Sequence, residues 1–179
     1  MNPVKLIKKT LLIIMLAYTP LLLATTTELP DSELTGSDGK KHHLKDYLTK
    51  GKWTTIVVWG PKCPACIGEM PAIQNLYDDR KKTNINVIGL AIDFPTFSYA
   101  DIKQVQQFEE DYFITFPNLL ISSDIYYELG LGTLQGTPTI VLVNPEGTVA
   151  AVQLGAIPAS DIKNFVARQE AEISLLSKK

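Results

Sequence analysis

Hydrophobic and polar positions along the chain follow two kinds of pattern, one typical of buried strands and one of amphipathic helices. The run WTTIVVW at residues 53–59 is β-branched and aromatic throughout, which predicts a buried central strand. Residues 86–92 form a second apolar run of the same kind. Between them, apolar positions from Ile67 to Tyr77 recur at helical spacing, which predicts a helix that runs to the basic residues 80–82. A strand, a helix and a strand in this order predict a right-handed βαβ unit.

The segments on either side of this unit are shorter. Residues 33–44 predict a hairpin about a turn at 37–40, where Ser, Asp and Gly gather. Ser98 is a candidate N-cap for a helix whose apolar positions fall within residues 102–112. Residues 124–130 predict a further short helix that a glycine ends.

The C-terminal third predicts a hairpin followed by a helix. Apolar runs at residues 139–143 and 149–152 flank the turn sequence NPEG, which suits an antiparallel hairpin. A final helix starts at Pro158, with apolar positions on one stripe up to Ile173. The order of elements predicts an α/β fold with a mixed sheet and helices on both faces. With no repeat or long linker after residue 27, residues 28–179 are expected to form one domain.

The first 27 residues have the features of an export segment. Lys5, Lys8 and Lys9 precede an uncharged stretch of 18 residues, 10–27. The stretch is at the lower limit of a membrane span, and Pro20 interrupts it. A cleaved signal peptide and a retained membrane anchor both fit residues 1–27, and both place the remainder outside the cytoplasm.

Composition excludes several classes of protein. The chain has 179 residues, 45% of them hydrophobic and 20% charged, with a mean hydropathy of +0.06. These values exclude a disordered chain and a multi-span membrane protein. The net charge of −2 provides no basic field for nucleic acid, so no nucleic-acid partner is expected. Two cysteines are too few for a disulfide scaffold or a four-ligand zinc site.

The two cysteines carry the candidate chemistry. Cys63 and Cys66 lie between the end of a predicted strand and the first turn of a predicted helix. Free N–H groups and the positive end of the helix dipole stabilise a thiolate there, and Lys62 acts in the same direction. Cys66 lies three residues along the helix, on the same face. We therefore expect Cys63 to be the attacking thiol and Cys66 the resolving thiol.

Other readings of the pair remain open at this point. A two-thiolate copper(I) clip could recruit His42 and His43, although two solvated histidines on a surface hairpin are the simpler interpretation. No histidine lies near the pair in sequence, which disfavours a Cys-His hydrolase. An incidental pair of buried cysteines would be unusual in a chain that has no others.

The segment WGPKCPACIGEMP at residues 59–71 resembles the active site of the TlpA/ResA/CcmG (DsbE-like) branch of thioredoxin-fold thiol-disulfide oxidoreductases. Two further positions carry the resemblance: Pro71, where the fold kinks its first long helix, and the loop GTPT at 136–139. Residues 93–124 match the inserted strand and helix of this branch. The resemblance implies a thioredoxin-like fold with an N-terminal hairpin and a central βα insertion.

The resemblance also assigns roles to single residues. Pro138 would be cis, where the residues alone allow a trans proline at a strand start equally well. The backbone of Thr137 could then pair with a substrate chain held over Cys63. Glu69, three residues after Cys66, would move a proton to or from the resolving thiol instead of being a solvated helix residue.

Two further positions concern the docking surface and the buried acid. In this family a Trp usually precedes the first cysteine, and Lys62 replaces it here, so the resemblance does not define the docking surface. Trp59 and Lys62 are included among the expected substrate contacts. Val57 stands where plain thioredoxin has a buried Asp, consistent with Glu69 taking over that role.

The function expected from these features is an exported thiol-disulfide oxidoreductase that reduces disulfides of selected proteins. The resemblance points to apocytochrome c as one substrate, to a membrane thiol donor, and to the periplasm or the outer face of the inner membrane. The two thiols carry the electrons, so neither a cofactor nor a metal is expected. A disulfide oxidase or isomerase, a copper(I) chaperone and a purely structural domain are the alternatives.

Overall fold

The computed structural model describes residues 28–93 and 100–177, and the predicted export segment lies outside them. Its strands are β1 (Glu33–Gly36), β2 (Lys41–His43), β3 (Trp53–Trp59), β4 (Ile85–Asp93), β5 (Asn118–Ser122), β6 (Thr139–Val143) and β7 (Val149–Leu154). Its helices are η1 (Leu44–Tyr47), α2 (Pro64–Asp78), α3 (Arg80–Thr83), α4 (Ile102–Asp111), α5 (Ser123–Tyr126), η2 (Tyr127–Leu131) and α6 (Ala159–Leu176). No helix among these residues is both long and apolar enough to span a bilayer.

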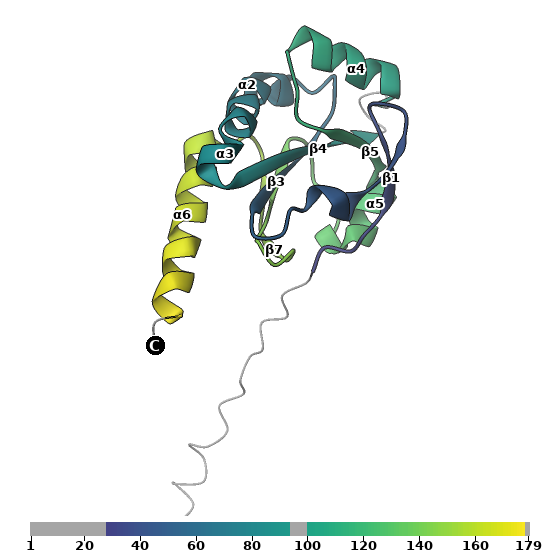
Figure 1. The fold of residues 1–179 in the computed structure, drawn as a ribbon. Helices are drawn as coiled ribbons and strands as arrows, with labels where there is room; N and C mark the ends of the chain where they lie inside the picture. Colours follow the sequence, from purple (N-terminus) through teal and green to yellow (C-terminus); the bar gives the residue numbers. More distant parts are fainter. Residues whose placement is uncertain (1–27, 94–99, 178–179) are drawn as a thin grey trace, which may run out of the picture.

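The strands form one mixed sheet in the order β2-β1-β5-β4-β3-β6-β7 (Figure 1). β3, β4 and β5 are parallel, and every other pairing is antiparallel. All seven residues of β3 are buried, so its side chains alternate between two cores. Trp53, Val57 and Trp59 pack with α2, α4 and α6, whereas Ile56 and Val58 pack with η1 and α5. The predicted α/β class and mixed sheet are confirmed.

Three expectations about single elements are corrected. The apolar pattern did not predict β5, which came only from the family insertion, and β5 joins the N-terminal hairpin to β4. The first long helix ends at Asp78, and the basic residues that follow form the separate α3. α4 is capped by Asp101, whose side chain accepts the N–H of Gln104 at 2.8 Å, and Ser98 lies outside the described residues.

Strand register brings two distant loops to the same end of the sheet. β3 ends at Trp59, and its carboxyl end leads through a short turn into α2. β6 runs antiparallel to β3, with Thr139 opposite Val58, so the loop before β6 lies where β3 ends. This end of the sheet therefore receives both Cys63 and Pro138. The start of β3 lies at the opposite end, beside the turn between β6 and β7.

Candidate active site

Cys63 and Cys66 are joined by a disulfide bond at the start of α2, with 5.2 Å between their Cα atoms. Cys66 is fully buried, whereas Cys63 retains 6% exposure. An approaching thiol or disulfide therefore has access to Cys63 only. This difference in access fits the predicted order, in which Cys63 attacks and Cys66 resolves.

The helix terminus is arranged around the sulfur of Cys63. Cys63 is the N-cap of α2, Pro64 occupies the first helical turn, and the N–H of Cys66 points at Cys63 Sγ at 3.2 Å. Proline suits this position because its missing N–H would have no partner in the helix. The first turn of α2 contains no acidic residue. The field of the helix terminus therefore favours negative charge on Cys63 when the disulfide is reduced.

The loop before β6 faces the same sulfur. The carbonyl oxygen of Thr137 lies 3.4 Å from Cys63 Sγ, and the Thr137–Pro138 bond is cis, which confirms the predicted isomer. The N–H of Gly155 donates to the carbonyl of Pro138 at 2.8 Å and ties the loop to the end of β7. Thr137 is half-buried and Pro138 is buried, so the accessible part of this loop lies on the Thr137 side.

Glu69 lies one helical turn after Cys66 on α2 and is only 6% exposed. Its Oε1 accepts the N–H of Ile157 at 2.8 Å, and its buried Oε2 has no hydrogen-bond partner among the described residues. Burial raises the pKa of this carboxyl, and the hydrogen bond from Ile157 opposes the rise only in part. Glu69 can therefore hold a proton at higher pH than an exposed glutamate.

The two remaining predicted residues have opposite environments. Lys62 is exposed next to Cys63 and forms no ion pair within the described residues. Trp59, by contrast, is 0% exposed and packs against Phe108 with the rings tilted by 48° and 4.5 Å between their centroids. The expected substrate contact by Trp59 is wrong, because a side chain closed off by the core cannot touch a docked protein.

Trp59 instead belongs to a buried polar network that the sequence did not reveal. Its Nε1 donates to Oδ1 of Asn118 at 2.9 Å, and Nδ2 of Asn118 donates to Glu109 of α4 at 2.9 Å. Gly89 of β4 leaves the space that Asn118 fills. The network fixes the end of β3, four residues before Cys63. Asn118, a polar residue directly before the apolar residues 119–121, was the one available signal.

The histidines lie on β2, an edge strand separated from β3 by three others. His42 contacts Asp38 Oδ1 and the hydroxyl of Tyr47, each at 2.9 Å, and His43 contacts Asp31 Oδ2 at 2.8 Å. Both side chains remain accessible to solvent, as we expected of histidines on a surface hairpin, and each also has a local hydrogen-bond partner. Within residues 28–93 and 100–177, no group of three or more His, Cys, Asp or Glu side chains could hold a metal ion.

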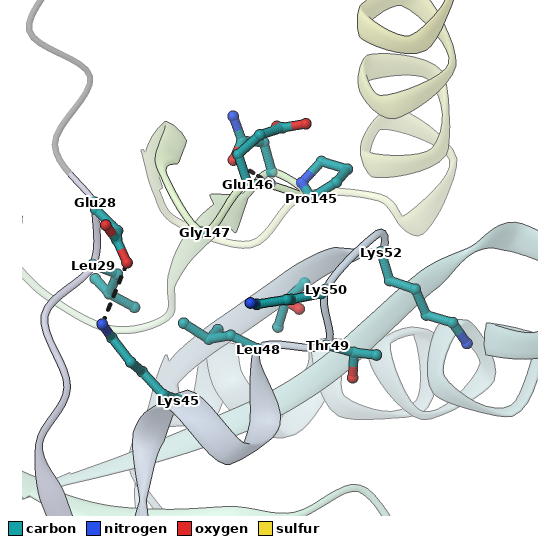
Figure 2. Close-up of a pocket in the computed structure, with 12 residues that line it drawn as sticks. Glu28, Leu29, Lys45, Leu48, Thr49, Lys50, Lys52, Pro145, Glu146 and Gly147 are labelled. Carbon is teal, nitrogen blue, oxygen red and sulfur yellow. Dashed lines mark hydrogen bonds and ion pairs between the residues drawn. The ribbon is translucent and has the colours of Figure 1, made fainter.

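A small cavity of about 120 Å³ lies away from the cysteines, beside the start of β3 and the turn between β6 and β7 (Figure 2). Lys45, Lys50 and Lys52 line it together with Glu28 and Glu146. Because the cavity is at the opposite end of β3 from Cys63, it is not part of the thiol site.

Comparison with known proteins gives one family and one activity. Residues 25–152 match the AhpC/TSA family. The protein named thiol-disulfide oxidoreductase ResA from Bacillus thuringiensis (strain Al Hakam) is 30% identical over 140 residues, covering 78% of this chain and 75% of that protein. ResA from Geobacillus thermodenitrificans (strain NG80-2) is 28% identical over 145 residues, covering 80% of this chain and 77% of its own.

Solved structures support the fold. The crystal structure of a thiol:disulfide interchange protein of the thioredoxin family from Chlorobium tepidum TLS aligns with a TM-score of 0.67 at 20% identity. The alignment covers 81% of this chain and 97% of that one. The thioredoxin-like fold that the resemblance implied is confirmed.

Proposed function

We propose, on the premise that this chain belongs to the AhpC/TSA family, that it is an exported enzyme that reduces disulfides of selected proteins through Cys63 and Cys66. The enzyme class is that of its relatives, a thiol-disulfide oxidoreductase. The observation that carries the proposal is the placement of the pair: an accessible sulfur and a buried one share a helix N-terminus.

The reaction balances with two electrons and no cofactor. In the reduced enzyme, the thiolate of Cys63 attacks a substrate disulfide, forming a mixed disulfide and releasing one substrate sulfur as a thiolate. The thiolate of Cys66 then attacks Cys63 Sγ, which re-forms the Cys63–Cys66 disulfide and releases the second substrate sulfur. The substrate gains two electrons and two protons, and an external dithiol must return them to the enzyme.

Glu69 and Thr137 support these steps. Glu69 takes the proton of the Cys66 thiol before that thiol attacks. It lies one helical turn after Cys66 in α2, and it is the only buried carboxylate among the described residues. The accessible backbone of Thr137 aligns an extended substrate segment beside Cys63, and exposed Lys62 borders the same segment.

Location, direction and partners complete the proposal. Residues 1–27 direct the domain out of the cytoplasm, to the periplasm or the outer face of the inner membrane. There the enzyme reduces proteins such as apocytochrome c and receives electrons from a membrane thiol donor. No histidine lies between the two cysteines to stabilise the thiolate further, which favours a low, thioredoxin-like potential over that of an oxidase.

Trapping tests the proposal directly. In Cys66→Ser, the mixed disulfide on Cys63 cannot be resolved, so we expect covalent complexes with exported cysteine-containing proteins that dissolve in reductant. Cys63→Ser is the matched control and should capture nothing. Equal capture by both variants, or none by either, would contradict the proposal. A strongly oxidising value in an equilibrium titration against glutathione would overturn the reducing direction alone.

A further inference from the structure

The described chain enters the fold at the end of the sheet that is opposite to Cys63. Glu28 forms a bridge to Thr148, and the N–H of Leu29 donates to the carbonyl of Gly147 at 3.0 Å. These contacts are at the turn between β6 and β7, next to the start of β3. In the sequence, the uncharged residues 10–27 come immediately before Glu28. An apolar segment is therefore attached at this end of the domain.

Lysines without acidic partners gather at the same end. Lys50 and Lys52 line the cavity beside Leu29, and neither forms an ion pair within the described residues (Figure 2). Lys81 of α3 likewise forms no ion pair within the described residues. Asn84, which directly follows α3, donates from Nδ2 to the carbonyl of Gly51 at 3.2 Å and so joins α3 to the loop that carries Lys50 and Lys52.

Most of the nearby acidic side chains are already neutralised. Glu28 pairs with Lys45 at 3.3 Å, and Asp79 pairs with Lys82 at 3.5 Å and with Lys163 at 3.3 Å. Glu146 is the acid that lines the cavity without a salt bridge. Among the residues that line the cavity and those of α3, the unpaired charge is therefore mainly positive.

Helix α6 extends past this end and leaves its apolar stripe uncovered. Ile162 and Val166 are buried, and Phe165 meets Trp53, the first residue of β3, at 6.0 Å between ring centroids. About 11 further residues, at 1.5 Å each, carry the helix about 16 Å beyond that contact. Figure 1 shows this part of α6 standing clear of the strands. On the same stripe, Ile173 is 51% exposed and Leu176 is 66% exposed.

We propose that these residues form a basal surface, Lys50, Lys52, Lys81, Ile173 and Leu176, that rests on an anionic phospholipid bilayer. Lysines pair with anionic headgroups, while apolar side chains at a helix end enter the boundary between headgroups and acyl chains. Each contact is weak, and the apolar segment attached at Glu28 holds them together at the bilayer. Glu170 and Glu172 flank the α6 stripe, so selectivity for anionic lipid is assigned to the lysines.

A second copy of the chain fits this surface less well. A two-fold contact places each patch against the same patch of its partner, which would bring unpaired lysines together. The bilayer also gives the site a direction. The seven residues of β3 span about 23 Å, so Cys63 is held on the side of the domain that faces away from the membrane.

Hydrogen exchange on the full chain in lipid nanodiscs tests this surface. We expect amides of residues 168–177 and 48–53 to exchange several-fold more slowly in discs of phosphatidylglycerol than in detergent, with a smaller effect in phosphatidylcholine. The double variant Lys50→Glu/Lys52→Glu should lose the difference between the two lipids. Ile173→Ser/Leu176→Ser should lose the slowing in α6.

Matched controls separate lipid contact from other causes. Lys40→Glu changes the same charge on the β1–β2 turn, which contacts α4 through Gln106 and Ser37, and should keep the lipid dependence. Insulin reduction by all variants should equal that of the original chain, because none of these residues belongs to the thiol site. Exchange that is identical in both lipids and detergent overturns the proposal. If amide exchange in these segments becomes slower as the protein concentration rises in detergent, the proposal is also overturned, in favour of a dimer.

Discussion

Glu69 is a carboxyl group whose surroundings favour the neutral form. Burial raises its pKa above the ordinary value of 4.5, at which the unfolded chain takes up the same proton. The folded state therefore gains stability from this proton below about pH 4.5 and loses that gain as the pH rises through the raised pKa. Ionised Glu69 is thus a cost to stability at neutral pH, and the proton transfer with Cys66 that we propose would give this buried carboxyl a use.

Replacing Glu69 with glutamine should make this cost visible. Gln keeps an oxygen for the N–H of Ile157 but cannot ionise. We expect Glu69→Gln to exceed the original chain in unfolding free energy at about pH 8, by on the order of 1 kcal/mol, and to match it at about pH 4. Urea denaturation of the oxidised proteins at both pH values measures the difference. Glu172→Gln changes an exposed residue of α6, and its unfolding free energy should differ from that of the original chain by the same amount at both pH values. The same behaviour of Glu69→Gln would refute the argument.

Gly89 is required by the side chains around it. A Cβ at this position would overlap Oδ1 of Asn118 and lie 2.8 Å from Nε1 of Trp59. Because Asn118 is held by bonds to Trp59, Glu109 and Phe116, it cannot move without breaking the network. We expect Gly89→Ala to lower the unfolding free energy by roughly 2 kcal/mol or more.

The control for Gly89 is another glycine with open space around it. At Gly68, inside α2, an added Cβ would meet no heavy atom within 4 Å other than its chain neighbours and the backbone of its own helix. Gly68→Ala should raise stability by roughly 0.5–1 kcal/mol, because alanine favours the helix. Urea titrations of both variants give the comparison. An unchanged midpoint for Gly89→Ala would show that the network yields easily.

At the scale of elements, α4 depends on its N-cap residue. Asp101 accepts the N–H of Gln104 at 2.8 Å, which satisfies one of the free donors of the first turn. Asp101→Ala should cost about 1 kcal/mol of unfolding free energy, whereas Asp101→Asn retains the acceptor and should cost only a few tenths. Thermal melts of both variants check this order. Equal melting of the two would mean that the cap contributes nothing.

Elements were predictable from sequence where one physical signal dominates. β3 and the two hairpins follow from continuous apolar runs and turn residues, and they lie within a residue or two of their predicted bounds. β5 was missed because two of its five residues are polar and its burial comes from neighbours on both sides. The cap of α4 was misplaced because Ser98 and Asp101 are equally good caps in isolation.

The site was predictable to the same extent. Cys63, Cys66 and the loop at Pro138 were identified from motifs, since their spacing carries the chemistry. The bond between Trp59 and Asn118 was not, because 59 residues separate the two and only the parallel sheet brings them together. The partner of Glu69 is a backbone N–H, which any residue at position 157 would supply, so the sequence holds no sign of it.

For the whole molecule, the sheet has two edges with unlike chemistry. β2 carries Lys41, His42 and His43, whereas the six residues of β7, VAAVQL, carry no charge. Val152 and Leu154 of β7 are 48% and 51% exposed, and β7 has no strand on its outer side in the part of the chain that the structure describes. An uncharged edge of this kind is a template for pairing with another chain.

A charge on β7 should therefore reduce association without changing the fold. Since Val152 is half-exposed, we expect Val152→Lys to alter the unfolding free energy by no more than about 0.5 kcal/mol. It should delay the rise in light scattering when the protein is held just below its melting temperature, because a lysine at the edge must be desolvated before another strand can pair. Lys41→Val on β2 is the reverse change and should hasten the rise. If both variants scatter like the original chain, association starts from the unfolded state and the edges play no part in it.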